Sequence, residues 1–335
     1  MTRRAALLHA GLFYAAFVWG STFVMVKDAL SGVDPFALCG WRFLLAAACL
    51  LPFLLRGGRW RRHPREGAVL AFLLSILYGA QTQGLLYTSA ANSGFITGTF
   101  ILFVPGFMFL RDRRVPGAGA WAAVLLALVG LRLVTGGPSG INPGDALTLL
   151  AALAYAAHLF AMDRWVRGEV DMTALAFQQF WMAGAACMLF AAFAGRPFGA
   201  APRSAGAIVF LTLVPTLSAY AAQMLAQREI APLTVSLVFA LEPVFAALFA
   251  WTLGGEPFRP LSALGGALIV SAIIVGELWG RESANLPESA SSLPPPSGGG
   301  QGGGEHFFQR HCFKTNGRTK VLPYPRPFPE GEGRQ

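Results

Sequence analysis

Three ionisable side chains lie inside long apolar stretches of the sequence, where a membrane-spanning helix rarely carries charge. Glu242, Arg42 and His158 each belong to a different stretch. Charge within lipid is costly, so such residues usually face a cavity or a partner. A carboxylate can hold a proton or a cationic group, a guanidinium can bind a carboxylate through two hydrogen bonds, and an imidazole titrates near neutral pH. These residue types indicate substrate binding or proton coupling.

Each of the three residues also has a structural interpretation. Glu242 could pair with Arg42 or with backbone donors, and Arg42 could join two helices or extend toward the membrane surface. His158, which helical spacing places next to Tyr155, could be a neutral, hydrogen-bonded packing residue. The sequence leaves both interpretations open, because one chain does not determine how its helices are rotated.

Amide and aromatic side chains complete the candidate set. Amides in lipid must find hydrogen-bond partners, so some of them join helices, and aromatic rings either pack or stack on a substrate. No convergent acids, bases or metal ligands are visible, so we predict no catalytic residue, no metal site and no cofactor. The predicted substrate-binding residues are Trp19, Arg42, Gln81, Tyr155, His158, Gln178, Trp181, Tyr220, Gln223 and Glu242, with Gln83 and Gln179 as further candidates.

Two prolines are predicted to break membrane helices at matching places. Proline removes a backbone hydrogen bond within a helix, and Pro105 and Pro243 stand at corresponding positions of the two halves of the chain. Paired breaks of this kind are typical of transporter binding sites near the bilayer midplane. Glu242, directly before Pro243, is therefore the sharpest candidate.

The composition places these residues in a membrane protein. Of the 335 residues, 54% are hydrophobic and only 13% are charged, whereas a soluble domain carries about 25% charged residues. A membrane helix needs about 20 apolar residues, and the chain offers ten such runs. We expect an all-α integral membrane protein with helices near 7–29, 36–55, 68–87, 94–110, 118–135, 145–162, 173–194, 206–226, 233–253 and 261–279.

Basic residues predict the orientation of these helices. The net charge of +9 comes from clusters between the apolar runs, so we interpret it as a topology determinant and not as a nucleic-acid surface. Lys27 and Asp28 are predicted to form an ion pair at the outer surface. Both termini are expected in the cytoplasm of a bacterial cell, with the protein in its inner membrane. The predicted inner segments hold Arg3, Arg4, Arg56, Arg59, Arg61, Arg62, Arg65, Arg111, Arg113, Arg114, Arg164, Arg167, Arg228 and Arg281; the outer ones hold Arg196, Arg203 and Arg259.

The two halves of the chain repeat one pattern at an offset of about 138 residues. The run that begins at Asp34 aligns with the run that begins at Asp171. Each half holds five spans, and because five is odd the second half must insert upside down. We predict a first repeat over 1–140, a second repeat over 141–282 and a disordered cytoplasmic segment over 283–335, which is rich in proline and glycine.

Several motifs resemble a known family. The run Phe17-Val18-Trp19-Gly20-Ser21-Thr22-Phe23, the run from Trp41 to Ala46, and the run from Leu241 to Leu248 followed by Glu256 resemble the EamA type of the drug/metabolite transporter superfamily. The resemblance covers about residues 7 to 280 and implies a ten-helix inverted-repeat fold that moves metabolites, often exporting amino acids. The family often has a Gly-Glu-Arg-like motif after its fourth span, where this chain has Arg111-Asp112-Arg113-Arg114.

We therefore predict a secondary transporter that moves a small metabolite, such as an amino acid, by alternating access, with export favoured by the resemblance. The expected partners are the substrate and membrane lipids, without nucleic acid, and homodimerisation is left open. The alternatives are a flippase for a lipid or lipid-linked substrate and, less favoured, a membrane-embedded enzyme. No phosphate-cradling motif for ATP and no channel-like filter segment is visible.

Overall fold

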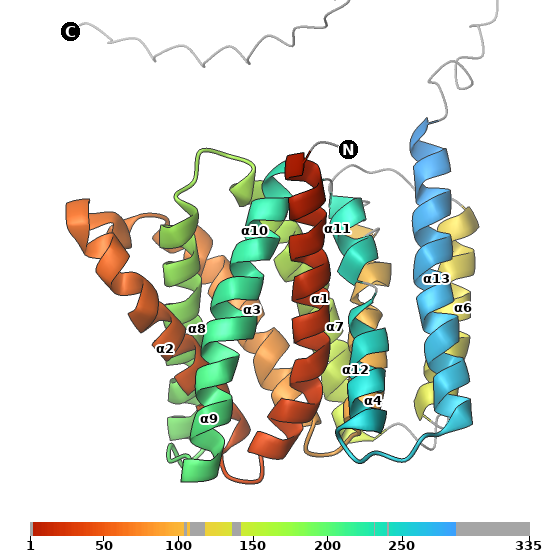
Figure 1. The fold of residues 1–335 in the computed structure, drawn as a ribbon, viewed down its shortest axis with the longest axis horizontal. Helices are drawn as coiled ribbons and strands as arrows, with labels where there is room; N and C mark the ends of the chain where they lie inside the picture. Colours follow the sequence, from red (N-terminus) through yellow and green to blue (C-terminus); the bar gives the residue numbers. More distant parts are fainter. Residues whose placement is uncertain are drawn as a thin grey trace, which may run out of the picture. The chain divides into compact units, whose positions relative to one another are not determined.

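The computed structural model describes residues 3–103, 106–107, 118–135, 142–230, 232–239 and 241–285, which belong to the compact unit Met1–Leu286 (Figure 1). Its elements are α1 (Arg3–Ala29), α2 (Pro35–Leu55), η1 (Arg56–Arg61), α3 (Pro64–Gly84), α4 (Ala90–Gly98), α6 (Ala118–Thr135), α7 (Pro143–Val166), α8 (Met172–Phe193), α9 (Pro202–Leu211), η2 (Thr212–Ser218), α10 (Ala219–Glu229), α11 (Pro232–Phe239), α12 (Glu242–Thr252) and α13 (Pro260–Asn285).

The predicted all-α membrane fold is confirmed. Each of the ten predicted segments contains helix, and five helices are long and apolar enough to cross a membrane. Among the described residues, β-type pairing is limited to one isolated bridge between Val33 and Ala200. Pro105 lies outside the described residues. Of the predicted disordered segment 283–335, residues 283–285 belong to the end of α13, and the rest lies outside the described residues.

Helix starts follow from capping side chains in the sequence. Asp34 caps α2 by accepting from the N–H of Phe36 (2.9 Å) and Ala37 (3.3 Å). Asn142 and Asp145 form a reciprocal capping box at the start of α7. Such caps satisfy backbone donors that have no partner within the helix, which matters most at the edge of the membrane.

Two reciprocal ion pairs join α2 and α8. Arg59, which follows α2, donates two hydrogen bonds to Asp171, the cap of α8, at 2.6 and 2.7 Å. Arg196, which follows α8, donates in turn to Asp34, the cap of α2, at 3.1 Å. The two helices are therefore antiparallel, and each end of the pair carries an ion pair between an arginine that follows one helix and the capping aspartate of the other. This exchange is what an inverted repeat produces.

The Arg59–Asp171 pair predicts a pH dependence of stability. The Arg59 guanidinium holds the pKa of Asp171 below its usual value of 3.8. A lowered pKa means that the stabilisation is fully present above pH 4 and is lost as the pH falls through the lowered value. The pair is partly exposed, so we expect a shift of a few degrees at most in the melting temperature. The melting temperature in detergent should fall less steeply between pH 6 and pH 3 in Asp171→Asn than in the wild type. Equal slopes of melting temperature against pH would contradict the prediction.

A π-helical turn, η2, interrupts the helix that runs from α9 into α10. Pro215 lies inside η2 and has no N–H to donate, so the backbone widens there. The carbonyl of Pro215 accepts from Trp19 Nε1 at 2.9 Å. The next residue, Thr216, accepts from Arg42 Nε through its hydroxyl at 2.5 Å. The irregular turn thus presents two polar groups to α1 and α2.

Close contact between α4 and α12 depends on glycine. Gly94 packs against Ala246, and a Cβ atom at Gly98 would lie 2.5 Å from Cγ of Pro243. Small residues let these helices approach, and α13 packs beside α6 in the same way, with Gly130 against Gly265 (Figure 1).

Gly98→Val is therefore expected to destabilise the protein by about 1–3 kcal/mol, because the added side chain overpacks the α4–α12 contact. Thermal unfolding in detergent measures this change. Gly206→Val is the matched control, since nothing lies within 4 Å of a Cβ atom at Gly206. A melting temperature that is unchanged in Gly98→Val, or lowered equally in both variants, would show that the contact is not tight.

The two ends of the helical unit carry different groups. The end where α1 begins and where α7 and α10 finish is called the basic end here; Arg4 and Glu229 pair there, and Arg167 donates to the carbonyl of Ile230 at 2.7 Å. At the opposite end, Lys27 donates to the carbonyl of Thr88 at 2.9 Å. The two halves thus share one feature. A cation at the end of the first helix donates to a backbone carbonyl: Lys27 of α1 to the carbonyl just before α4, and Arg167 after α7 to the carbonyl just before α11.

Candidate functional site

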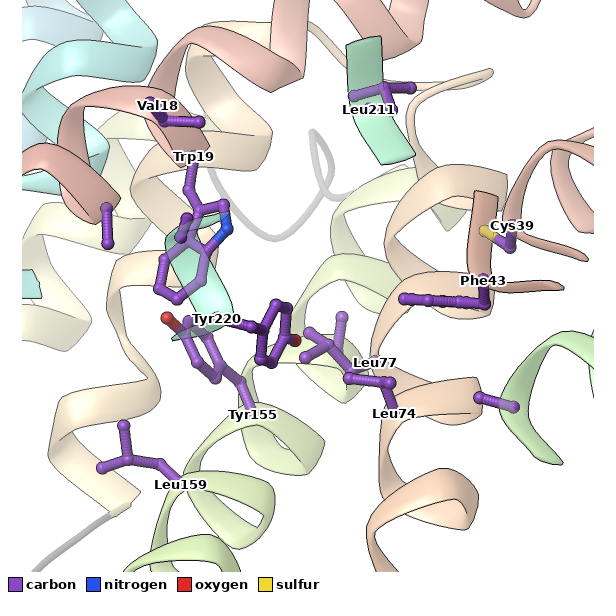
Figure 2. Close-up of a cluster of buried hydrophobic side chains, with 14 of the residues drawn as sticks. Val18, Trp19, Cys39, Phe43, Leu74, Leu77, Tyr155, Leu159, Leu211 and Tyr220 are labelled. Atoms are coloured by element: carbon purple, nitrogen blue, oxygen red, sulfur yellow. The ribbon is translucent and has the colours of Figure 1, made fainter. Parts of the chain in front are cut away.

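Aromatic side chains from α1, α7 and α10 meet in the interior. The Trp19 ring lies 5.3 Å from the Tyr220 ring and 6.4 Å from the Tyr155 ring, both edge to face. Figure 2 shows these three side chains turned toward one another, each from a different helix. Phe239, the last residue of α11, closes the group at 5.1 Å from Trp19. Edge-to-face packing stabilises such a group beyond the area that it buries.

Arg42 lies at one side of this aromatic group and is only 3% exposed. Besides its bond to Thr216, it approaches Tyr78, whose hydroxyl lies 3.5 Å from a terminal guanidinium nitrogen. The guanidinium carbon stands 4.5 Å from the centre of the Tyr78 ring, a cation–π distance. No carboxylate of the described residues forms an ion pair with Arg42, so its charge is met by neutral groups.

Glu242 lies at the other side and is 5% exposed. It occupies the first turn of α12, directly after the break that separates α12 from α11. The hydroxyl of Tyr155 donates to Oε2 at 3.4 Å. No cation of the described residues pairs with Glu242, including Arg42. The unpaired N–H groups at the start of α12 favour negative charge at this position.

A tyrosine pair connects the two charged residues. The Tyr220 hydroxyl donates to the Tyr78 hydroxyl at 3.4 Å, so a continuous line of contacts runs from Arg42 through both tyrosines and Trp19 to the Tyr155–Glu242 pair. The central cluster is defined as Trp19, Arg42, Tyr78, Tyr155, Tyr220 and Glu242. It holds one buried guanidinium and one buried carboxyl group, separated by aromatic rings.

His158 and Gln223 lie beside the central cluster. The His158 ring stands 6.1 Å from the Tyr220 ring, and its Nε2 lies 3.0 Å from Oε1 of Gln179. Gln223 is one helical turn after Tyr220 on α10 and is completely buried. The sequence thus identified a set that the fold brings together: Trp19, Arg42, Tyr155, His158, Tyr220, Gln223 and Glu242.

Three predicted residues lie elsewhere. Gln81 donates to the Thr97 hydroxyl at 3.0 Å and joins α3 to α4. Gln178 donates to the carbonyl of Trp60 at 2.6 Å, and Trp181 donates to Gln178, also at 2.6 Å. The Gln178 contact ties α8 to η1, whereas the Trp181 contact lies within α8.

Sequence reasoning missed Tyr78 and Thr216. Thr216 looks like an ordinary helix residue, because a threonine hydroxyl in an apolar run commonly bonds to its own helix backbone. Tyr78 looks like an ordinary packing aromatic. The available indication was position: Thr216 follows a proline, and Tyr78 stands three residues before the candidate Gln81.

A pocket of about 460 Å³ lies at the opposite end from the basic end. Glu256 in its wall accepts from the N–H of Ala90 (2.6 Å) and Ala91 (3.2 Å), so it caps α4, and it pairs with Lys27 at 3.2 Å. The predicted partner of Lys27, Asp28, is therefore replaced by Glu256. The pocket is lined by Lys27, Leu86, Tyr87, Thr88, Ser89, Ala91, Asn92, Asn142, Trp251, Glu256, Pro257, Arg259 and Ser262.

Comparisons with known proteins agree with this geometry. A transporter of Archaeoglobus fulgidus that is named uncharacterized is 34% identical over 272 residues, which are 80% of this chain and 85% of the relative. The uncharacterized inner membrane transporter YedA of Escherichia coli is 27% identical over 286 residues, 82% of this chain and 91% of YedA. An S-adenosylmethionine/S-adenosylhomocysteine transporter of Chlamydia trachomatis is 26% identical over 293 residues, 79% of this chain and 88% of that protein.

A solved crystal structure shares the fold, with a TM-score of 0.61 at 20% identity over 84% of this chain and 99% of the other. The sequence profile of the EamA-like transporter family matches the chain twice, over residues 7–136 and 142–276. The chain is therefore a membrane transporter that belongs to the EamA-like transporter family of the drug/metabolite transporter superfamily.

Proposed function

We propose that this protein transports a small zwitterionic metabolite, of the amino acid type, and that the central cluster is its binding site. The observation that carries the proposal is that the two buried ionisable side chains, Arg42 and Glu242, do not form an ion pair with each other. Arg42 and Glu242 lie in one cluster, yet each is met by neutral groups of the described residues and not by the other.

A substrate with a carboxylate and an ammonium group would complement both charges. Arg42 would bind the carboxylate, for which a planar guanidinium is well suited, and Glu242 would bind the ammonium group. Buried charges without a counterion are costly, so the binding of such a substrate would be strongly favoured over that of a neutral molecule. The aromatic rings between them would hold an apolar or aromatic side group of the substrate.

The name of one relative supports a substrate of this kind. The protein of Chlamydia trachomatis is named for S-adenosylmethionine and S-adenosylhomocysteine, both of which carry an amino acid end and an aromatic base. Trp19, Tyr155 and Tyr220 would provide the stacking surface for a ring of that kind. The chemical class that we propose is therefore an amino acid or an amino acid conjugate.

Exchange of a proton for the substrate ammonium group at Glu242 would couple transport to proton movement. A single carboxylate can bind either the substrate ammonium group or a proton, so the loss of one would permit the binding of the other. The break before α12 lets the two halves of this span move separately, as alternating access requires. Opposite movement of protons and substrate would drive export from the cell.

Arginine distribution supports a location in the inner membrane with both termini in the cytoplasm. Arg4, Arg59, Arg62 and Arg167 gather at the basic end, which would be the cytoplasmic end. The E. coli relative YedA is named an inner membrane transporter.

Uptake into proteoliposomes tests the proposal. Purified protein would be assayed with labelled amino acids and S-adenosylmethionine, with and without a pH gradient that is acidic outside or inside. We expect accumulation of at least one zwitterion that follows the gradient. If no zwitterion moves while a lipid-linked substrate does, the flippase alternative replaces this proposal.

A further inference from the structure

A second group of buried polar residues adjoins the central cluster. The inner polar patch is defined as His158 of α7, Gln179 of α8, and Gln223 and Gln227 of α10, and all four side chains are 0% exposed. Because His158 packs against Tyr220 at 6.1 Å, the patch touches the central cluster directly. The helices α7 and α10 carry it from there toward the basic end.

The patch contains buried atoms that the protein leaves without partners. Nδ1 of His158, Nε2 of Gln179, both amide atoms of Gln223, and Oε1 of Gln227 have no hydrogen-bond partner among the described residues. Each such atom costs roughly 1–3 kcal/mol if it stays unpaired. Several of these costs fall in one place, so a polar partner for these atoms would stabilise the protein.

The polar side chains of the patch follow one another along α10 and α7 toward the basic end. Tyr220, Gln223 and Gln227 follow one another at helical spacing on one side of α10, and Gln227 donates to the carbonyl of Leu159 on α7 at 3.3 Å. The line continues to Asp163, which pairs with Arg167 at the end of α7 at 3.0 Å. From Tyr155 to Asp163 this path spans about 12 Å along α7.

We propose that the inner polar patch binds a chain of water molecules that connects the central cluster with the basic end. The patch offers both donors and acceptors, as a bound water needs, since internal waters make about three hydrogen bonds each. Complete burial of all four side chains between packed helices favours an occupant of this size over a part of the substrate.

The water chain gives protons a route to the Tyr155–Glu242 pair. The titratable or charged groups along the route are Tyr155 and Tyr220 of the central cluster, His158 beside it, and Asp163 with Arg167 at the basic end. The hydration itself does not depend on the proposed function, because it follows from unpaired atoms outside the central cluster.

Radiolytic hydroxyl-radical footprinting of the full-length protein in lipid nanodiscs tests the proposal. Radicals that form from bound water oxidise adjacent side chains even where bulk solvent is excluded. After each rate is divided by the intrinsic reactivity of its side chain, Tyr220 and Met224, each 3% exposed, should be oxidised severalfold faster than the fully buried Phe43. Gln223→Leu should lower both rates severalfold.

Gln81→Leu is the matched control, because this amide is bonded to Thr97 away from the patch and its loss should leave the rates at Tyr220 and Met224 unchanged. Oxidation of Tyr220 and Met224 in the wild type as slow as that of Phe43 would overturn the proposal. So would rates that are equal in the wild type and in a folded Gln223→Leu. If Gln223→Leu does not fold, Gln179→Leu replaces it, and the wild-type rates still decide.

Discussion

Glu242→Gln is expected to abolish substrate accumulation that is driven by a pH gradient. Glutamine keeps the shape of the side chain but binds neither a proton nor an ammonium group as a carboxylate does. Loss of one partner of a buried charge contact costs about 2 kcal/mol or more, which is about 30-fold in affinity. Uptake of a labelled zwitterion into proteoliposomes, measured with and without the gradient, gives the result.

Glu169→Gln is the matched control for this prediction, because Glu169 is exposed beyond the end of α7. It should accumulate substrate as the wild type does. Thermal unfolding in detergent shows whether Glu242→Gln is folded. A folded Glu242→Gln that accumulates substrate at the wild-type rate would return Glu242 to a structural role beside Tyr155.

Arg42→Gln is expected to weaken substrate binding by a similar factor of about 30, through loss of the contact with the substrate carboxylate. Arg42→Lys should recover only part of this loss, since an ammonium group does not reproduce the two-pronged geometry or the contact with the Tyr78 ring. The concentration dependence of uptake measures the effect as a rise in KM.

An esterified analogue separates recognition from folding. The ester lacks the carboxylate charge, so its KM should differ little between the wild type and Arg42→Gln. Arg65→Gln, at an exposed position in the first turn of α3, serves as the arginine control and should match the wild type. Equal losses for the zwitterion and its ester would mean that Arg42 only supports the packing of α2 against η2.

The fold could be predicted from the sequence because the membrane imposes strict limits on helix length and polarity. Each of the ten apolar runs contains helix in the described part of the chain, and the antiparallel α2 and α8, joined by the Arg59–Asp171 and Arg196–Asp34 pairs, agree with the predicted inversion. The π-turn η2 was not predicted, because Pro215 looks like a simple kink until the backbone is seen. The boundaries of the two repeats stay a prediction.

The candidate site was only partly predictable. Charged residues such as Arg42 and Glu242 were found because burial in lipid makes them rare and therefore informative. Gln178 and Trp181 were expected beside the substrate, but α8 is apolar on all sides, so periodicity could not orient it. Tyr78 was missed for a different reason: its role depends on Tyr220, which is distant in sequence and adjacent only in the fold.

Complementarity to a zwitterion is most directly tested by equilibrium binding to the wild-type protein in detergent. A transported zwitterion would be compared with its decarboxylated amine and its deaminated acid, each of which keeps one charge. If Arg42 and Glu242 bind opposite ends of the substrate, both analogues should bind at least about tenfold more weakly than the zwitterion. If either analogue binds as tightly as the zwitterion, the central cluster does not recognise the two charges together, and the account is wrong.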